Sequence, residues 1–220
     1  MTAPPSFPER FNMAHYFLDA RIEEGRGDHC AVIDDGGRYT YRQVQALANQ
    51  VGNVLSAMGV GVEDRVLIAL SDGVEFAATF FGVLKIGAVV TMVNPELPDA
   101  DYEHYLDYTR ARALVGDIGL TNRIAPLLRA SKLLRGVISA GAGGDWGETV
   151  GRASPSLINF DTSKDDPSVW LFTSGSTGKP KGAVHLHHDF PFNTECYAKQ
   201  VLQMRPDDVT LGVPKLFFGY

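Results

Sequence analysis

Apolar residues recur at helical spacing in the first third of the chain. Between Val44 and Met58 they fall three and four positions apart, which places them along one face of an α-helix. Thr40 stands at the position of a helix N-cap, and Gln43 follows it at the spacing of a capping box. Gly59 comes directly after the pattern, as at many helix ends. The sequence therefore predicts an amphipathic helix with one buried face.

Short apolar runs alternate with further helical patterns along the rest of the chain. Strands are expected at residues 30–33 and 38–41, which form a hairpin, and at 65–70, 88–93, 113–115, 136–139, 169–172, 183–187 and 209–213. Further helices are expected at 14–23, capped by Asn12, and at 74–86, 101–110, 122–134 and 191–204. This alternation predicts an α/β fold with largely parallel sheets and helices on their faces.

Two stretches stand apart from this alternation. Residues 1–10 contain three prolines, so we expect a loose arm there. Residues 140–164 are rich in Gly, Ser and Asp, which favours a long surface connection.

The composition narrows the classes of protein. The chain has 220 residues, 45% of them hydrophobic, and a formal net charge of -6, so it can bury a sizeable core and has no basic stripe for nucleic acid. No window reaches the roughly 18 apolar residues of a membrane span, and the N-terminus lacks the pattern of a secretion signal. The two cysteines, Cys30 and Cys196, form no CxxC pair. We therefore expect a cytoplasmic protein without a zinc site and without a nucleic-acid or membrane partner.

Candidate chemistry is concentrated directly after the buried strand at residues 169–172. Residues 173–182, here called the glycine-rich segment, read TSGSTGKPKG. Its hydroxyls and lysines can bind and neutralise phosphate oxygens, and glycines such as Gly182 allow positive φ angles and close approach of the backbone to a ligand. A strand that leads into such a segment predicts a polyphosphate-binding loop.

The glycine-rich segment does not fit the Walker pattern of P-loop proteins. Pro180 follows Gly178 and Lys179, where that pattern requires Ser or Thr to open a helix. Proline also restricts the preceding residue to extended conformations. A plain flexible surface turn is the alternative, and the uniform suitability of the ten residues for phosphate disfavours it.

The glycine-rich segment resembles the signature loop of the adenylate-forming superfamily, letter for letter. That superfamily includes acyl- and aryl-CoA ligases, adenylation domains of peptide synthetases, and luciferases. Residues 38–41 with the following helix, and residues 84–95, also resemble segments of this family. The resemblance implies that residues 1–220 are the incomplete first half of the large N-terminal domain. The C-terminal domain and the remainder of the protein would lie outside this chain.

Two further stretches, residues 11–19 and 214–220, resemble benzoate-type aryl-CoA ligases. The resemblance implies a reaction in two steps. A small aromatic carboxylic acid, benzoate or a relative such as aminobenzoate, attacks the α-phosphorus of ATP to give an aryl-adenylate and pyrophosphate. The thiol of coenzyme A then displaces AMP. Positioning and charge neutralisation, with Mg²⁺ on the phosphate oxygens, drive such chemistry, so no side-chain nucleophile is needed.

The resemblance also implies the site residues. The β- and γ-phosphates of ATP would contact Thr173, Ser174, Gly175, Ser176, Thr177, Gly178, Lys179 and Lys181. If only one lysine contacts phosphate, we favour Lys181, because Pro180 fixes the chain that leads into it. The aromatic acid would contact Phe218, Gly219 and Tyr220, and Lys215 would attract its carboxylate. The alternatives are a core position for Phe217 and Phe218 and a merely exposed Lys215.

No catalytic residue and no metal site is identified. Three histidines, at 185, 187 and 188, lack the spacing of a metal-ligand set, and we favour packing near the nucleotide or aryl pocket. The resemblance places an acidic residue for Mg²⁺, an aspartate for ribose and a mobile catalytic lysine in later motifs, beyond residue 220. We therefore expect these 220 residues alone to be inactive.

Three other functions are weighed against the aryl-CoA ligase. An aryl-acid adenylation enzyme would load a carrier-protein thiol in place of coenzyme A. A nucleotide-binding module would bind ATP without catalysis. A P-loop hydrolase or kinase is disfavoured by Pro180.

Overall fold

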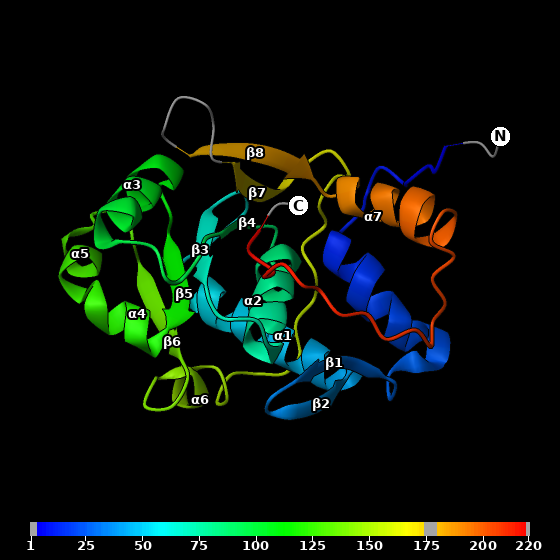
Figure 1. Cartoon of the computed structure of the whole chain (residues 1–220), viewed down its shortest axis with the longest axis horizontal. Coiled ribbons are helices and arrows are strands. Elements are labelled where there is room, and N and C mark those ends of the chain that lie inside the picture. Colours follow the sequence, from blue (N-terminus) through cyan, green and yellow to red (C-terminus); the bar gives the residue numbers. More distant parts are fainter. Residues whose placement is uncertain (1–3, 174–179, 219–220) are drawn as a thin grey trace.

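The computed structural model describes residues 4–173 and 180–218, which form an α/β fold around one six-stranded sheet (Figure 1). The strand order is β6-β5-β3-β4-β7-β8. All neighbouring pairs are parallel except the last, in which β8 runs antiparallel to β7. The strands are β3 (Arg65–Ala69), β4 (Val89–Met92), β5 (Ala113–Asp117), β6 (Gly136–Ala140), β7 (Pro167–Thr173) and β8 (Lys181–Leu186). The prediction of an α/β fold with a largely parallel sheet is confirmed.

Helices cover both faces of the sheet. α1 (Tyr41–Ala57) and α2 (Val74–Lys85) lie on one face, and the other face carries α3 (Asp99–Thr109), α4 (Ile118–Arg123) and α5 (Ala125–Ala130). Alternating residues of β3 show the two layers, because Val66 packs with α1 and α2 whereas Leu67 packs with α3. After Arg65 the strand is apolar and buried, as the sequence predicted.

The N-terminal hairpin and α1 follow the sequence closely. β1 (Cys30–Asp34) pairs antiparallel with β2 (Gly37–Thr40). The predicted capping box is present: Gln43 N donates to Thr40 Oγ1 at 3.3 Å, and Thr40 N donates to Gln43 Oε1 at 2.8 Å. α1 packs closely on α2 where Gly82 faces it, since a Cβ at Gly82 would lie 2.7 Å from the carbonyl oxygen of Ala48.

The chain before β1 is helical from 13 to 26 and includes the π-helical segments η1 (His15–Asp19) and η2 (Ile22–Arg26). Asn12 Oδ1 accepts the N–H of Ala14 at 2.9 Å, in agreement with the expected cap. The described part of the N-terminal arm contacts the domain, since Glu9 forms an ion pair with Lys164 at 2.6 Å.

The long connection before β7 is tied to the surface of α1. It contains the short helix α6 (Trp146–Thr149). Asn53 Nδ2 donates to the carbonyl oxygens of Ser154 at 2.8 Å and Ser156 at 3.0 Å, and Asn49 donates to Pro155 O at 2.8 Å. Side-chain amides of α1 therefore hold this connection in place.

Two expected helices have different bounds in the structure. The helix expected at 122–134 is instead the pair α4 and α5, separated at Ile124, where φ is -95° and ψ is 14°. Pro126, in the first turn of α5, lacks the N–H that a continuous helix would need. After β8 the chain forms α7 (Asp189–Asn193) and η3 (Thr194–Lys199), so the helix expected at 191–204 begins earlier and ends at Lys199.

The strand predicted at residues 209–213 is wrong. Its apolar side chains are exposed, with Leu211 90% and Val213 88% accessible. In the described ranges, residues 209–213 have no cross-strand partner. An apolar alternation forms a strand only where a neighbouring backbone accepts its hydrogen bonds. Among the described residues, no helix is long and apolar enough to cross a membrane.

Candidate active site

The glycine-rich segment joins β7 to β8 at the carboxyl end of the parallel strands. Thr173 and Lys181, near its two ends, are cross-strand partners. β7 lies beside β4 in parallel, so Thr173 and Met92 both end strands at the same edge of the sheet. Ligands of open α/β sheets bind in crevices at this edge, so the fold places Thr173 and Lys181 where a ligand is expected.

The structure places two of the eight predicted phosphate-binding residues. Thr173 and Lys181 are both exposed at the ends of β7 and β8, and the Lys181 ammonium forms no ion pair with a residue that the structure describes. The remaining six, residues 174–179, lie outside the described residues, and their roles stay predictions. Gly182 is part of the extended strand β8 and is not among the glycines with positive φ, so the expected freedom is not used there.

A hollow of about 510 Å³, here called the loop-side hollow, adjoins the described ends of the glycine-rich segment. Thr173 and Pro180 line it, and so do Phe217 and Phe218. The sequence assigned Thr173 to ATP and Phe218 to the aromatic acid. The structure brings the two residues together at one hollow.

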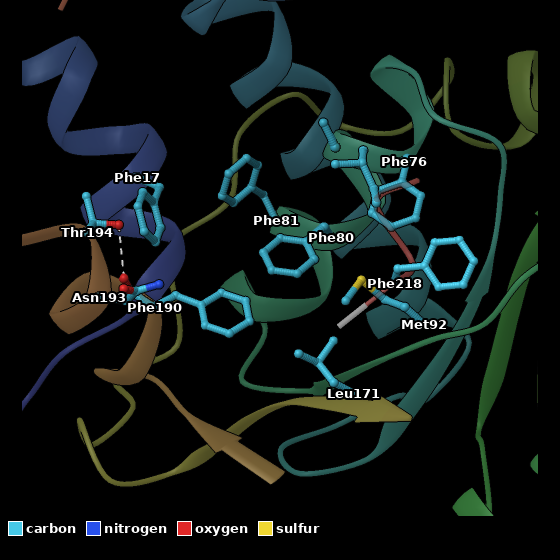
Figure 2. Close-up of a pocket in the computed structure, with 12 residues that line it drawn as sticks. Phe17, Phe76, Phe80, Phe81, Met92, Leu171, Phe190, Asn193, Thr194 and Phe218 are labelled. Carbon is cyan, nitrogen blue, oxygen red and sulfur yellow. Dashed lines mark hydrogen bonds between the residues drawn. The ribbon is translucent and has the colours of Figure 1, made fainter. Parts of the chain in front are cut away.

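A second hollow of about 580 Å³, here called the aromatic hollow, adjoins the first (Figure 2). Both hollows share Met92, Leu171 and Phe218 in their walls. Phenylalanines from four parts of the chain surround the aromatic hollow, namely Phe17, Phe76, Phe80, Phe81, Phe190 and Phe218. At one end of this hollow, Thr194 Oγ1 donates to the carbonyl oxygen of Phe190 at 2.9 Å. The combined space is largely apolar with polar groups at its ends, as small-molecule sites are.

Sequence reasoning missed the aromatic hollow. It took the apolar residues of α2 for buried core, and Phe76 is indeed buried, yet Phe80 and Phe81 are only partly buried and face the hollow. The signal that could have found it is a helix with three phenylalanines within six positions and few polar residues on any side.

Contacts with the turn before α2 fix the segment that carries Phe218. Leu216 N donates to Asp72 Oδ1 at 3.0 Å, and Phe218 N donates to the carbonyl oxygen of Lys215 at 3.0 Å. The rings of Phe217 and Phe218 lie 4.7 Å apart. Lys215 Nζ is 3.5 Å from Asp72 Oδ2 and lines neither hollow. Gly219 and Tyr220 lie outside the described residues.

The histidines occupy three different environments. His185 lines the loop-side hollow and contacts Asp189 Oδ2 at 3.3 Å. His187 is fully buried, its Nδ1 accepts the N–H of Met13 at 3.0 Å, and burial lowers its pKa to about 4. His188 Nδ1 lies 3.2 Å from Asp165. In the part of the chain that the structure describes, no group of three or more His, Cys, Asp or Glu side chains is placed to hold a metal ion.

The sheet is largely parallel, and the loop-side hollow at its carboxyl edge adjoins the described ends of the glycine-rich segment. These features define an α/β domain of the nucleotide-binding class. A family model confirms and narrows that class. The model of the AMP-binding enzymes matches residues 18–220, and the chain belongs to this adenylate-forming family.

Individual relatives agree with the family. The chain is 36% identical to a benzoate–CoA ligase of Thauera aromatica over 222 residues. The alignment covers 99% of this chain and 42% of that protein. A crystal structure of the anthranilate CoA ligase AuaEII in complex with anthranoyl-AMP superposes with a TM-score of 0.90 at 29% identity, over 96% of this chain and 40% of that one.

A benzoate CoA ligase from Burkholderia xenovorans LB400 is also similar. Its crystal structure superposes with a TM-score of 0.85 at 32% identity, over 96% of this chain and 41% of that one. The chain therefore spans about two fifths of the length of these relatives. The matches confirm that it corresponds to the first part of the large N-terminal domain of adenylate-forming enzymes.

Proposed function

We propose that the full-length protein uses ATP to activate a small aromatic carboxylic acid and transfers the aryl group to coenzyme A. The observation that carries this proposal is the loop-side hollow, whose wall includes Thr173, the first residue of the glycine-rich segment, and Phe218, which also lines the aromatic hollow. A planar apolar ring with one carboxylate fits a space that is aromatic at one end and adjoins a phosphate-binding segment at the other.

The proposed chemistry uses the substrate's own carboxylate as the nucleophile. One carboxylate oxygen bonds to the α-phosphorus of ATP, and the bond to the β-phosphate oxygen breaks to release pyrophosphate. The thiolate of coenzyme A then bonds to the acyl carbon, and AMP leaves with that oxygen. The protein's part is to position the groups and to stabilise charge.

The described residues support distinct roles in that scheme. The hydroxyl of Thr173 and the ammonium of Lys181 would bind the β- and γ-phosphates. Six further residues of the glycine-rich segment would bind them too, namely Ser174, Gly175, Ser176, Thr177, Gly178 and Lys179. Charge-assisted hydrogen bonds of this kind are about twice as strong as neutral ones. Phe218, with Gly219 and Tyr220, would form the aryl wall.

Lys215 is proposed to attract the substrate carboxylate, although its Nζ pairs with Asp72 Oδ2 at 3.5 Å and it lines neither hollow. Mg²⁺ enters the proposal on the triphosphate of ATP, since this ion commonly binds through substrate phosphates and one or two carboxylates. We propose benzoate or an aminobenzoate as the acid, because the relatives include a benzoate–CoA ligase and an anthranilate CoA ligase.

A second acceptor of the aryl group is a carrier-protein thiol. The similarity to a probable non-canonical nonribosomal peptide synthetase of Salinispora arenicola favours this acceptor. The two sequences are 32% identical over 213 residues, and the alignment covers 92% of this chain and 3% of that protein. The first half-reaction is the same for both acceptors, so only the second half-reaction distinguishes them.

A pyrophosphate-release assay on the full-length protein tests the proposal. The panel is benzoate, 2-aminobenzoate and 4-hydroxybenzoate against a medium-chain fatty acid, each with ATP and with or without coenzyme A. We expect release with the aromatic acids and formation of an aryl-CoA thioester. Release with the fatty acid alone would overturn the aryl assignment. Adenylate formation without reaction of coenzyme A would favour the carrier-protein acceptor. ATP binding without release of pyrophosphate would indicate a nucleotide-binding module without catalysis.

A further inference from the structure

Gly182, the last residue of the glycine-rich segment, lies under three aromatic rings. A Cβ at this position would be 3.3 Å from the Trp170 ring, 3.5 Å from the Phe172 ring and 3.6 Å from the Tyr108 ring. Gly182 N donates to Tyr108 Oη at 3.5 Å. Trp170 and Phe172 belong to β7, whereas Tyr108 belongs to α3. The strand that leaves the glycine-rich segment is therefore covered by a helix far away in sequence.

Ring packing fixes the position of Tyr108 relative to β7. Its ring centroid lies 6.1 Å from that of Phe172 and 6.3 Å from that of Trp170, with both pairs edge to face. Tyr105, one turn earlier on α3, packs on Phe172 with centroids 4.6 Å apart. Aromatic pairs in this geometry add stability beyond that of the area they bury.

The sheet in turn holds the end of α3. Arg65 Nε, on β3, donates to the carbonyl oxygen of Thr109 at 2.7 Å, and the Arg65 guanidinium lies 5.9 Å from the centre of the Trp170 ring. Tyr102 Oη donates to the carbonyl oxygen of Asn94, directly after β4, at 2.7 Å. Tyr108 is thus attached to a part of α3 that is anchored at both ends.

We propose that Tyr108 is a positioning residue for the ATP phosphates, acting through Gly182 on the adjoining Lys181. This inference rests on the proposed function of the glycine-rich segment. The Tyr108 hydroxyl and ring fix the backbone of β8 one residue after Lys181, and so limit where the lysine ammonium can lie. A segment ordered before ATP arrives loses less conformational entropy on binding.

The test measures ATP affinity and steady-state kinetics of the full-length protein and of three variants. Tyr108→Phe removes the hydroxyl and keeps the ring, and Gly182→Ala adds a Cβ that crowds the Trp170 ring and contacts the Phe172 and Tyr108 rings. Tyr197→Phe is the matched control, because Tyr197 on η3 (Thr194–Lys199) is 52% exposed against 45% for Tyr108 and lies in a different part of the fold.

We expect Tyr108→Phe to raise the Kd and KM for ATP about threefold, which is the low end for one neutral hydrogen bond. Gly182→Ala should also raise both, because its Cβ crowds the Trp170 ring beside Gly182. The KM for the aromatic acid should stay unchanged in both variants, a split that loss of overall stability would not produce. Tyr197→Phe should leave the Kd for ATP unchanged.

Three results would overturn the inference. These are an unchanged ATP affinity in both Tyr108→Phe and Gly182→Ala, an equal rise in KM for ATP and for the acid, and an effect of Tyr197→Phe as large as that of Tyr108→Phe. The proposed function has a separate test. If the wild-type protein binds ATP but activates no aromatic acid, the proposed function is wrong, while the Kd values for ATP still test the role of Tyr108. A wild-type protein that does not bind ATP would contradict both.

Discussion

Replacing Lys85 by Met should destabilise the fold severely, because Lys85 is buried with a single carboxylate partner. Its side chain at the end of α2 is 2% exposed, and that of Asp19 on η1 is 9% exposed. Lys85 Nζ donates to the two carboxylate oxygens of Asp19 at 2.6 and 2.7 Å and to Asn159 Oδ1 at 2.9 Å. Gln45 Nε2 also donates to Asp19 at 2.7 Å. Four separate segments of the chain therefore meet at this ion pair.

The magnitude follows from what the substitution leaves behind. Burial raises the pKa of Asp19, but hydrogen bonds from Lys85 and Gln45 outweigh it and leave that pKa lowered, so the carboxylate is charged. Lys85→Met leaves this buried charge with amide partners only. Removing one partner of a buried pair costs about 3–5 kcal/mol, a large part of the roughly 5–15 kcal/mol that stabilises a typical domain.

Urea unfolding followed by tryptophan fluorescence measures this cost. We expect the free energy of unfolding to fall by about 4 kcal/mol in Lys85→Met and to recover to within about 1 kcal/mol of the wild type in the double variant Lys85→Met/Asp19→Leu. The exposed Lys132→Met is the control and should change it by less than about 0.5 kcal/mol. A cost below about 1 kcal/mol in Lys85→Met, or no recovery in the double variant, would refute the reasoning.

Three further predictions concern the pH dependence of stability and the candidate site. Burial lowers the pKa of His187 to about 4, so between pH 6.5 and 4 the unfolded chain binds a proton that the folded chain does not. The free energy of unfolding should therefore fall by about 3 kcal/mol over this range. Urea titrations at several pH values should show that His187→Asn loses much of this dependence. Phe218→Ala should raise the KM for the aromatic acid about tenfold with the KM for ATP unchanged, whereas equal changes in both would contradict an aryl wall. Lys181→Met should lower kcat/KM for ATP about 10²-fold in the pyrophosphate assay, and wild-type kinetics would remove Lys181 from the phosphate site.

The local rules of the sequence were sufficient where structure depends on neighbours along the chain. The capping box at Thr40 and Gln43, the hairpin before it and the apolar run of β3 all lie where the sequence predicted them. Each depends on residues within a few positions, or on burial that an unbroken apolar run already indicates.

The errors arose where structure depends on distant partners. Residues 209–213 have the apolar pattern of a strand, but among the described residues no backbone pairs with them. Gly182 was expected to serve a ligand through conformational freedom, yet it lies in an extended strand where its small size leaves room for the Trp170 ring. The contact with Tyr108, 74 positions earlier, has no local signal in the sequence.

The same distinction applies to the candidate site. The residue types of the glycine-rich segment suffice to predict phosphate binding, because hydroxyls, glycines and lysines have that chemistry in any fold. The aromatic hollow combines Phe17, Phe80 and Phe190 from separate elements, and only the packing of η1, α2 and α7 brings them together. The aromatic hollow and the loop-side hollow share Phe218 in their walls. The hydrophobic periodicity of the sequence alone could not predict that the two hollows adjoin.

The most direct test of the account follows the oxygen atoms of the acid. The full-length protein would be incubated with ATP, coenzyme A and benzoate whose two carboxylate oxygens are oxygen-18, and the products would be analysed by mass spectrometry. If the carboxylate attacks the α-phosphorus, one labelled oxygen appears in AMP and the other remains in the benzoyl thioester, while pyrophosphate carries none. Unlabelled AMP, or label in inorganic phosphate together with ADP, would contradict adenylate formation at this site.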